Sequence, residues 1–160
     1  MQIFFSDEAY RRIEETVRKK NNRSETGGVL LGHKIDGAFY IVSATTQVSD
    51  GLNNHHSFIL DGEAESLAAE KIMSEYEFTP NLLGVWHSHT NGNALFSTQD
   101  RLSNKVLAES IGEAVSVIVT YSKKNGFLMT PYFIGSKDEE ETIETGCCAI
   151  PNEFLAKKEG

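Results

Sequence analysis

The feature that most constrains this chain is an unbroken apolar run that ends in two histidines. Leu82–Trp86 carries no polar side chain, which predicts a central strand covered on both faces. His87 and His89 follow, and because side chains alternate along a strand, both imidazoles point to one side and Trp86 to the other. Such a pair can bind one metal ion through two nitrogens, although two histidines at a strand end are more often ordinary surface residues.

A carboxylate follows at a spacing that a metal site can use. Asp100 lies eleven residues after His89, and Ser97 is a good N-cap for a helix whose first turn contains Asp100. Two imidazoles and one carboxylate suit zinc, and three protein ligands leave one tetrahedral position open, as in catalytic zinc sites. The alternative role of Ser97 is helix capping alone, and the two roles are compatible.

A glutamate far upstream is a further candidate. Glu25 stands just before Gly27-Gly28 and the apolar run Val29–Leu31, which predicts the start of a buried strand. Most glutamates in such positions are solvated surface charges. The paired glycines, however, permit a close approach of the backbone and unusual torsion angles beside a site.

These two motifs resemble the signature of the JAMM (JAB1/MPN/Mov34, MPN+) zinc metalloproteases, and the short chain is most similar to the prokaryotic JAB subset. The family pattern is His-x-His, seven residues, Ser, two residues and Asp, with a glutamate far upstream. The chain matches this pattern in full, with Glu25, His87-Ser88-His89, Ser97 and Asp100. Thr90 and Phe96 stand where the family often has proline, which leaves the rigidity of the loop between the ligands open.

The resemblance implies a zinc-dependent isopeptidase or peptidase with one Zn²⁺ per chain. His87, His89 and Asp100 would ligate the ion, which would lower the pKa of a bound water to about 7. Glu25 would act as general base and acid, and Ser97 would donate a hydrogen bond to the oxyanion. The substrate would be a ubiquitin-like protein or its conjugate, with its C-terminal tail extended in a groove.

Among the family, the chain most resembles the stand-alone deconjugases of bacterial anti-phage operons, of the CBASS type and of ubiquitin-like conjugation systems. Activating and conjugating enzyme homologues of the same operon are then expected partners. Two alternatives share the fold. One is a metallopeptidase that releases an amino acid from a small sulfur-carrier protein. The other is a non-catalytic MPN scaffold, against which the complete set of motif residues speaks.

The order of predicted elements indicates an α+β fold, close to an α/β sandwich, around a mixed sheet. The resemblance covers about residues 4–135 and implies the MPN/JAMM fold, a cytidine-deaminase-like curved mixed β-sheet flanked by helices. Strands are expected at 38–46, 58–60, 82–89, 114–121 and 127–134. Turns are expected at 32–37, tightest at Asp36-Gly37, and at Asn125-Gly126, with a loop at 50–54.

Three helices are expected, from Ser6 to Lys20, over 63–76, and after Ser97. The apolar stripe of the second helix consists of Ala64, Leu67, Ala68, Ile72 and Tyr76. The apolar residues of the third helix are Leu102, Val106, Leu107 and Ile111.

One domain over residues 1–160 is the simplest organisation, with a core at about 4–135 and a solvated acidic segment and short tail at 136–160. The net charge of −8 argues against nucleic acid as a partner, and no apolar run approaches the roughly 20 residues of a membrane span. No signal-peptide pattern is visible, and the adjacent Cys147-Cys148 fits a reducing, cytoplasmic location. His55-His56 are interpreted as loop residues beside the substrate groove.

Overall fold

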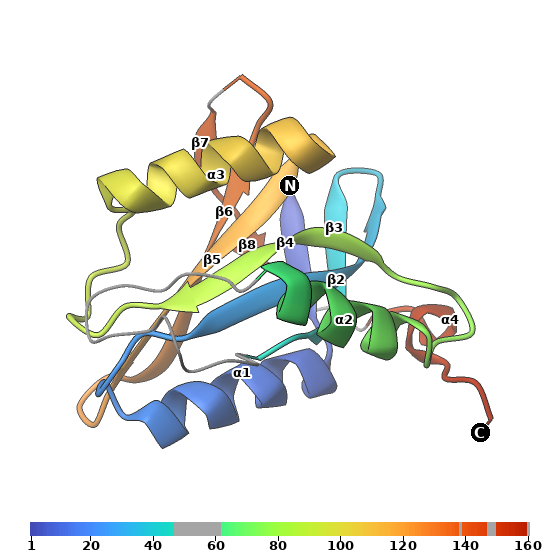
Figure 1. Ribbon diagram of the computed structural model, residues 1–160, viewed down its shortest axis with the longest axis horizontal. Coiled ribbons are helices and arrows are strands. Elements are labelled where there is room, and N and C mark those ends of the chain that lie inside the picture. Colours follow the sequence, from blue (N-terminus) through green and yellow to red (C-terminus); the bar gives the residue numbers. More distant parts are fainter. Residues whose placement is uncertain (47–61, 138, 147–149, 160) are drawn as a thin grey trace.

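A mixed sheet of eight strands organises the part of the chain that the structure describes (Figure 1). The structure is a computed structural model that describes residues 1–46, 62–137, 139–146 and 150–159. The strands lie in the order β7-β6-β5-β4-β2-β3-β1-β8. Their bounds are β1 (Gln2–Phe5), β2 (Gly27–Ile35), β3 (Ala38–Ala44), β4 (Asn81–Ser88), β5 (Ala114–Ser122), β6 (Gly126–Ile134), β7 (Glu140–Thr142) and β8 (Glu144–Thr145).

Helices cover both faces of this sheet. On one face lies α1 (Asp7–Lys20), whose Ile13 shares a buried cluster with Trp86. On the other face lie α2 (Gly62–Met73) and α3 (Thr98–Ile111), and Ala108 of α3 packs with Ile118 of β5 (Figure 1). A short helix, α4 (Asn152–Leu155), follows near the C-terminus. The curved mixed sheet flanked by helices confirms the predicted α+β fold.

The N-terminal helix forms where the sequence predicts it, because both of its ends carry local signals. Ser6 Oγ accepts a hydrogen bond from Ala9 N at 3.0 Å, and the same hydroxyl donates to Val42 O at 2.7 Å. At the other end, Asn21 adopts the left-handed conformation with a φ of 48°. The N-cap therefore closes the first turn and also ties the helix to β3.

The turn predicted at 32–37 is shorter than expected, because β2 continues to Ile35 and only Asp36-Gly37, the tightest part of the predicted turn, turns the chain. Gly32 is needed for packing, since a Cβ there would collide with the carbonyl oxygen of Tyr40 on β3. The β2–β3 register shifts between Leu31 and Gly32, at the point of this close approach. A glycine that looks like a turn signal thus marks a strand irregularity.

The apolar face predicted for the third helix is largely uncovered. Leu102, Val106 and Ile111 are 57%, 62% and 36% exposed, whereas Asn104 and Ala108 are buried against the sheet. Ser97 is the N-cap, as predicted. Helical periodicity identifies an apolar face, but it does not say whether a sheet or an open groove lies against that face.

The second helix also differs from its prediction. It ends at Met73 instead of Tyr76, and Leu67 is 63% exposed. Glu65 is buried in its place, and Thr45 Oγ1 on the end of β3 donates a hydrogen bond to the Glu65 carboxylate. This polar contact explains the buried carboxyl group that an apolar stripe does not predict.

The acidic segment after β6 is solvated, as the sequence predicts, but it also forms two short strands that the sequence does not predict. It contributes both edge strands, with β7 paired to β6 and β8 paired to β1. Their side chains are exposed, so neighbouring backbones provide the pairing. The predicted strand 58–60, the loop 50–54, His55-His56 and Cys147-Cys148 lie outside the described residues. Within the described ranges, no helix is long and apolar enough to cross a membrane.

An aromatic cluster fastens α4 to β2. The His33 ring stacks on Phe154 and Phe78 at centroid distances of 4.3 and 4.7 Å. His33 is 5% exposed, and its Nε2 has no hydrogen-bond partner among the described residues. Burial lowers the pKa of His33, although the charge of Glu153 opposes the shift. The folded protein therefore holds this imidazole neutral.

Acid should destabilise the protein through His33. The unfolded chain binds the proton at the ordinary pKa of about 6.5 and the folded chain only at lower pH, so the free energy of unfolding should fall as the pH drops below about 6.5. We expect His33→Phe, which keeps the ring stacking, to lose less unfolding free energy than the wild type between about pH 7 and about pH 5. Urea unfolding at both pH values measures the difference. Equal losses in the two proteins would contradict it.

Candidate metal centre

The end of β4 brings the two predicted histidines to one point. β4 pairs antiparallel with β2 and parallel with β5, so it is a central strand. Just past the strand, His89 N donates to Val119 O at 2.9 Å, which keeps the backbone extended between the two histidines. His87 and His89 are each 8% exposed, and Trp86 points into the core on the opposite face, as predicted.

Asp100 completes a group of three possible ligands. His87 Nε2 and His89 Nε2 are 2.9 Å apart, and they lie 3.2 and 3.1 Å from the two carboxylate oxygens of Asp100. Two ligands of one tetrahedral zinc, with bonds of about 2.0 Å, are separated by about 3.3 Å. The three side chains therefore already have nearly the spacing that a single ion requires, and they can hold a metal ion.

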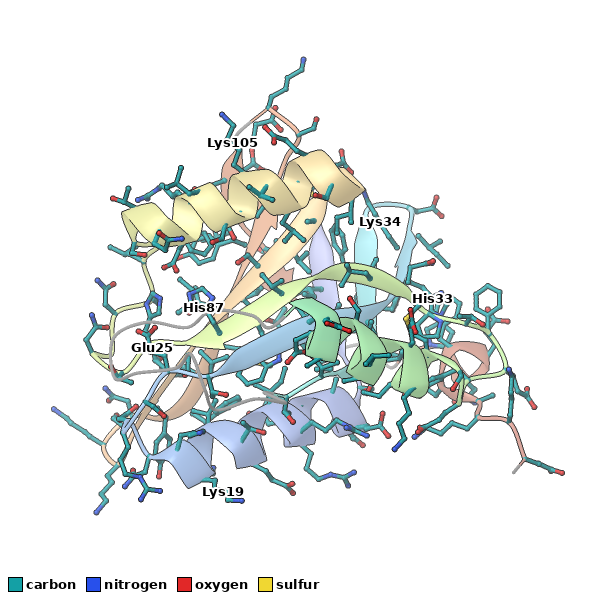
Figure 2. The ribbon with its side chains drawn as sticks, viewed as in Figure 1. Lys19, Glu25, His33, Lys34, His87 and Lys105 are labelled. Atoms are coloured by element: carbon teal, nitrogen blue, oxygen red, sulfur yellow. The ribbon has the colours of Figure 1, made fainter. Side chains whose placement is uncertain are left out.

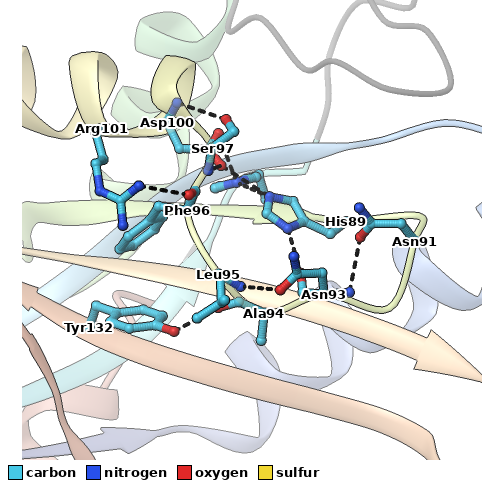
Figure 3. Close-up of polar contacts among 11 residues, drawn as sticks. His89, Asn91, Asn93, Ala94, Leu95, Phe96, Ser97, Asp100, Arg101 and Tyr132 are labelled. Carbon is cyan, nitrogen blue, oxygen red and sulfur yellow. Dashed lines mark hydrogen bonds and ion pairs between the residues drawn. The ribbon is translucent and has the colours of Figure 1, made fainter.

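The start of α3 fixes the Asp100 carboxylate. Ser97 Oγ accepts a hydrogen bond from Asp100 N at 3.1 Å, and Asp100 Oδ2 accepts one from Ser97 N at 2.8 Å (Figure 3). This reciprocal capping box satisfies two backbone donors at the helix start. The same contacts hold the carboxylate toward His89 and place the Ser97 hydroxyl beside the ligand group.

A backbone carbonyl orients His89. Its Nδ1 lies 2.6 Å from Asn93 O, and because a carbonyl oxygen can only accept, Nδ1 carries the proton. In the neutral ring, Nε2 then presents its lone pair to the ligand position. No sequence pattern predicts this contact, because any residue at position 93 has a carbonyl.

Hydrogen bonds and charges within the ligand group stabilise the protonated form of His89 and the ionised form of Asp100. Burial opposes a charged His89, but hydrogen bonds to Asp100 and Asn93 and the charges of Asp100 and Glu25 together raise the pKa of His89. Burial would also raise the pKa of Asp100, but hydrogen bonds from His87 and His89 lower it well below its usual range. Asp100 is thus a carboxylate at neutral pH and attracts a cation.

The loop between the metal ligands lacks the two prolines that the family often has, and hydrogen bonds hold it in place instead. Asn93 N donates to Asn91 Oδ1 at 2.9 Å, and Tyr132 Oη on β6 donates to Ala94 O at 2.6 Å (Figure 3). An asparagine side-chain turn and an anchor to the sheet therefore provide the rigidity that the sequence left open. Their effect is to keep the Asn93 carbonyl against His89.

Glu25 reaches the same point from the neighbouring strand. Ser88 N donates to Thr26 O at 2.8 Å, and Thr26 N donates to Ser88 Oγ at 2.9 Å. These bonds continue the β2–β4 contact one residue before the start of β2, to Ser88 at the end of β4. The antiparallel register then sets Glu25 beside His89, on the sheet side that carries both imidazoles.

Glu25 faces the ligand group without belonging to it. It lines one cavity together with His87 and Asp100, and Figure 2 shows it next to His87 at the same end of the sheet. Among the described residues, the ligand group contains His87, His89 and Asp100 and not Glu25. A carboxylate that is close to a metal position but outside its ligand set can exchange protons with a molecule bound there.

An apolar groove leads away from this point between β4 and α3. It is a cavity of about 430 Å³, and Glu25, His87 and Asp100 line its polar end. Its largely apolar walls come from the two elements and include Leu82, Val85, Val106, Leu107 and Ile111, with Ser103 and Ser110 as polar residues of α3 among them. Val106 and Ile111, which the sheet leaves uncovered, are therefore groove residues, whereas Leu102 lies outside the groove. Sequence periodicity could not distinguish such groove residues from core.

Comparison with known proteins places the chain in a family. The model of a family described as prokaryotic homologs of the JAB domain matches residues 8–131. The chain belongs to this prokaryotic JAB family. This JAB protein is similar in fold to the solution structure of protein DSY2949 from Desulfitobacterium hafniense, with a TM-score of 0.65 and 18% identity over 91% of this chain and 93% of that chain. No curated protein sequence matches.

The JAB domain should bind one metal ion per chain through the His-His-Asp group. We expect His87→Ala with His89→Ala to abolish binding and Asp100→Ala to weaken it, because each change removes ligands. Ser97→Ala should keep the metal and lose about 1 kcal/mol of folding stability, since it removes only the side-chain half of the cap. Metal analysis after dialysis against zinc, with unfolding curves, measures both effects. Equal metal loss in Asp100→Ala and Ser97→Ala would show that the assigned roles are wrong.

Proposed function

We propose that this JAB protein is a zinc metallopeptidase of the JAMM type. The observation that carries the proposal is that three ligand atoms lie within 4.8 Å of one another while Glu25 lines the same cavity as a separate carboxylate. Three protein ligands leave a coordination position for a substrate or water. A non-catalytic scaffold needs neither that position nor a carboxylate beside it.

The proposed chemistry is hydrolysis of an amide or isopeptide bond. When bound, zinc supplies Lewis acidity to the substrate carbonyl and lowers the pKa of water to about 7. Glu25 takes a proton from the attacking water and passes it to the leaving nitrogen as the C–N bond breaks. Ser97 Oγ already accepts the Asp100 N–H, so its hydroxyl proton is left for donation to the oxyanion.

The proposed substrate is a ubiquitin-like protein or its conjugate. The cavity has a polar end at the reacting groups and apolar walls along β4 and α3, which suits an extended peptide tail of several residues. By resemblance to the stand-alone deconjugases, we extend the proposal to a cytoplasmic role in an anti-phage operon, with activating and conjugating enzyme homologues as partners.

Glu25→Gln tests the mechanism. The variant should fold and bind zinc like the wild type, because Glu25 lies outside the ligand group. Its cleavage rate should fall by about 10²–10⁴, because glutamine cannot accept the proton or return it. The measurement is cleavage of a panel of ubiquitin-like domains fused to a fluorescent reporter, with metal analysis on the same preparations.

Two outcomes of this experiment would contradict the proposal. A zinc-loaded wild type that cleaves none of the fusions would remove the proposed activity. Wild-type turnover in Glu25→Gln would remove the proposed role of Glu25. The matched control is Glu77→Gln, which changes an exposed glutamate outside the cavity and should leave both zinc content and rate unchanged.

A further inference from the structure

Six of the fifteen lysine and arginine residues gather at one end of the molecule. We call this surface the basic end, and it consists of Arg18, Lys19, Lys20, Arg23, Lys123 and Lys124. Four of these residues lie in the last turn of α1 and the loop after it, and two lie in the turn between β5 and β6. The chain as a whole has a net charge of −8, so this surface has the opposite sign to the protein that carries it.

Specific contacts join the two segments into one surface. Asn22 Nδ2 in the loop donates to Tyr121 O at the end of β5 at 2.8 Å. The Arg18 guanidinium lies 5.0 Å from the centre of the Tyr121 ring. Arg23 Nη2 donates to Lys19 O at 2.9 Å, which closes the loop back onto the helix. The relative position of the two cationic segments is therefore fixed by the fold.

Among the described residues, two glutamates of α1 lie close in sequence to Arg18 and Lys19. Glu14 forms an ion pair with Arg18 at 3.2 Å, and Glu15 is an exposed neighbour on α1. The Glu14–Arg18 pair is solvent-accessible, and such pairs are weak. Lys19, Lys123 and Lys124 are exposed. The inference therefore rests on these three lysines, which present positive charge to solvent from both segments of the basic end.

The basic end adjoins the catalytic end of the sheet. Arg23 is two residues before Glu25, and β5 continues from Val119, which bonds His89, to the turn that carries Lys123. Figure 2 shows Lys19 toward the same end of the molecule as Glu25 and His87. The apolar groove leads the other way along β4, from His87 back to Leu82.

We propose that the basic end binds an acidic protein surface on the leaving-group side of the substrate. The inference rests on the proposed function, in which the groove holds the acyl-side tail and Glu25 protonates the leaving nitrogen. A substrate seated in that way extends past Glu25 toward the basic end. An acidic partner is repelled by most of this protein and attracted at one end, which orients it for productive binding.

The experiment compares two fusions of the same ubiquitin-like domain, one with a glutamate-rich leaving segment and one with glutamines at the same positions. We expect kcat/KM to be about tenfold higher for the glutamate-rich fusion at low salt, with the advantage lost at high salt. The triple variant Lys19→Glu, Lys123→Glu, Lys124→Glu should lose this preference through KM, with kcat and the glutamine fusion unchanged. The control, with the same change in net charge, is Lys71→Glu, Lys137→Glu, Lys158→Glu, which should retain the preference.

A binding measurement separates failure of this inference from failure of the proposed function. Fluorescence anisotropy with a labelled glutamate-rich peptide needs no catalysis, and the zinc-loaded wild type should bind the peptide more tightly than the triple variant does. Equal binding, or equal fusion preference in the triple and control variants, would overturn the inference. Binding of a labelled RNA that displaces the peptide and is lost in the triple variant would also overturn it, in favour of nucleic acid.

Discussion

The antiparallel pairing of β2 with β4 is the constraint on which the rest of the site depends. It sets Glu25 beside His89, although more than sixty residues separate them in the chain. Gly28 permits this packing, because a Cβ there would collide with the carbonyl oxygen of Thr45. That oxygen accepts a hydrogen bond from Trp86 Nε1 at 2.8 Å. The fully buried Trp86 thus anchors the opposite face, and the ligands stand on a rigid strand.

The parts of the site that the sequence predicts are those that depend on local geometry. Alternation along a strand is enough to place His87 and His89 on one side and Trp86 on the other. Helix capping is enough to place Asp100 one turn inside a helix that begins after Ser97. The location of Glu25, by contrast, does not follow from local geometry, because it depends on the pairing of two strands that are distant in sequence. The family resemblance indicated it, and the register of β2 with β4 gives the physical reason.

The parts that the sequence does not predict depend on what lies opposite a residue. Val106 and Ile111 have the spacing of a buried helix face, yet they line an open groove. Gly32 has the sequence pattern of a turn residue, yet it lies within β2 and allows β3 to approach closely. The edge strands β7 and β8 carry exposed acidic side chains, so the backbones of their neighbours select their conformation and no hydrophobic pattern marks them. Each of these differences arises from the part of the fold that lies opposite the residue. None of them moves the predicted metal ligands.

The central claim is that one zinc ion sits among His87, His89 and Asp100 while Glu25 stays outside its ligand set. Anomalous diffraction at the zinc edge from crystals of the zinc-loaded protein tests this claim most directly. The account predicts one peak per chain, about 2.0–2.2 Å from the two Nε2 atoms and from one Asp100 oxygen, with no Glu25 oxygen at bonding distance. A peak elsewhere, or one ligated by Glu25 in place of Asp100, would contradict it.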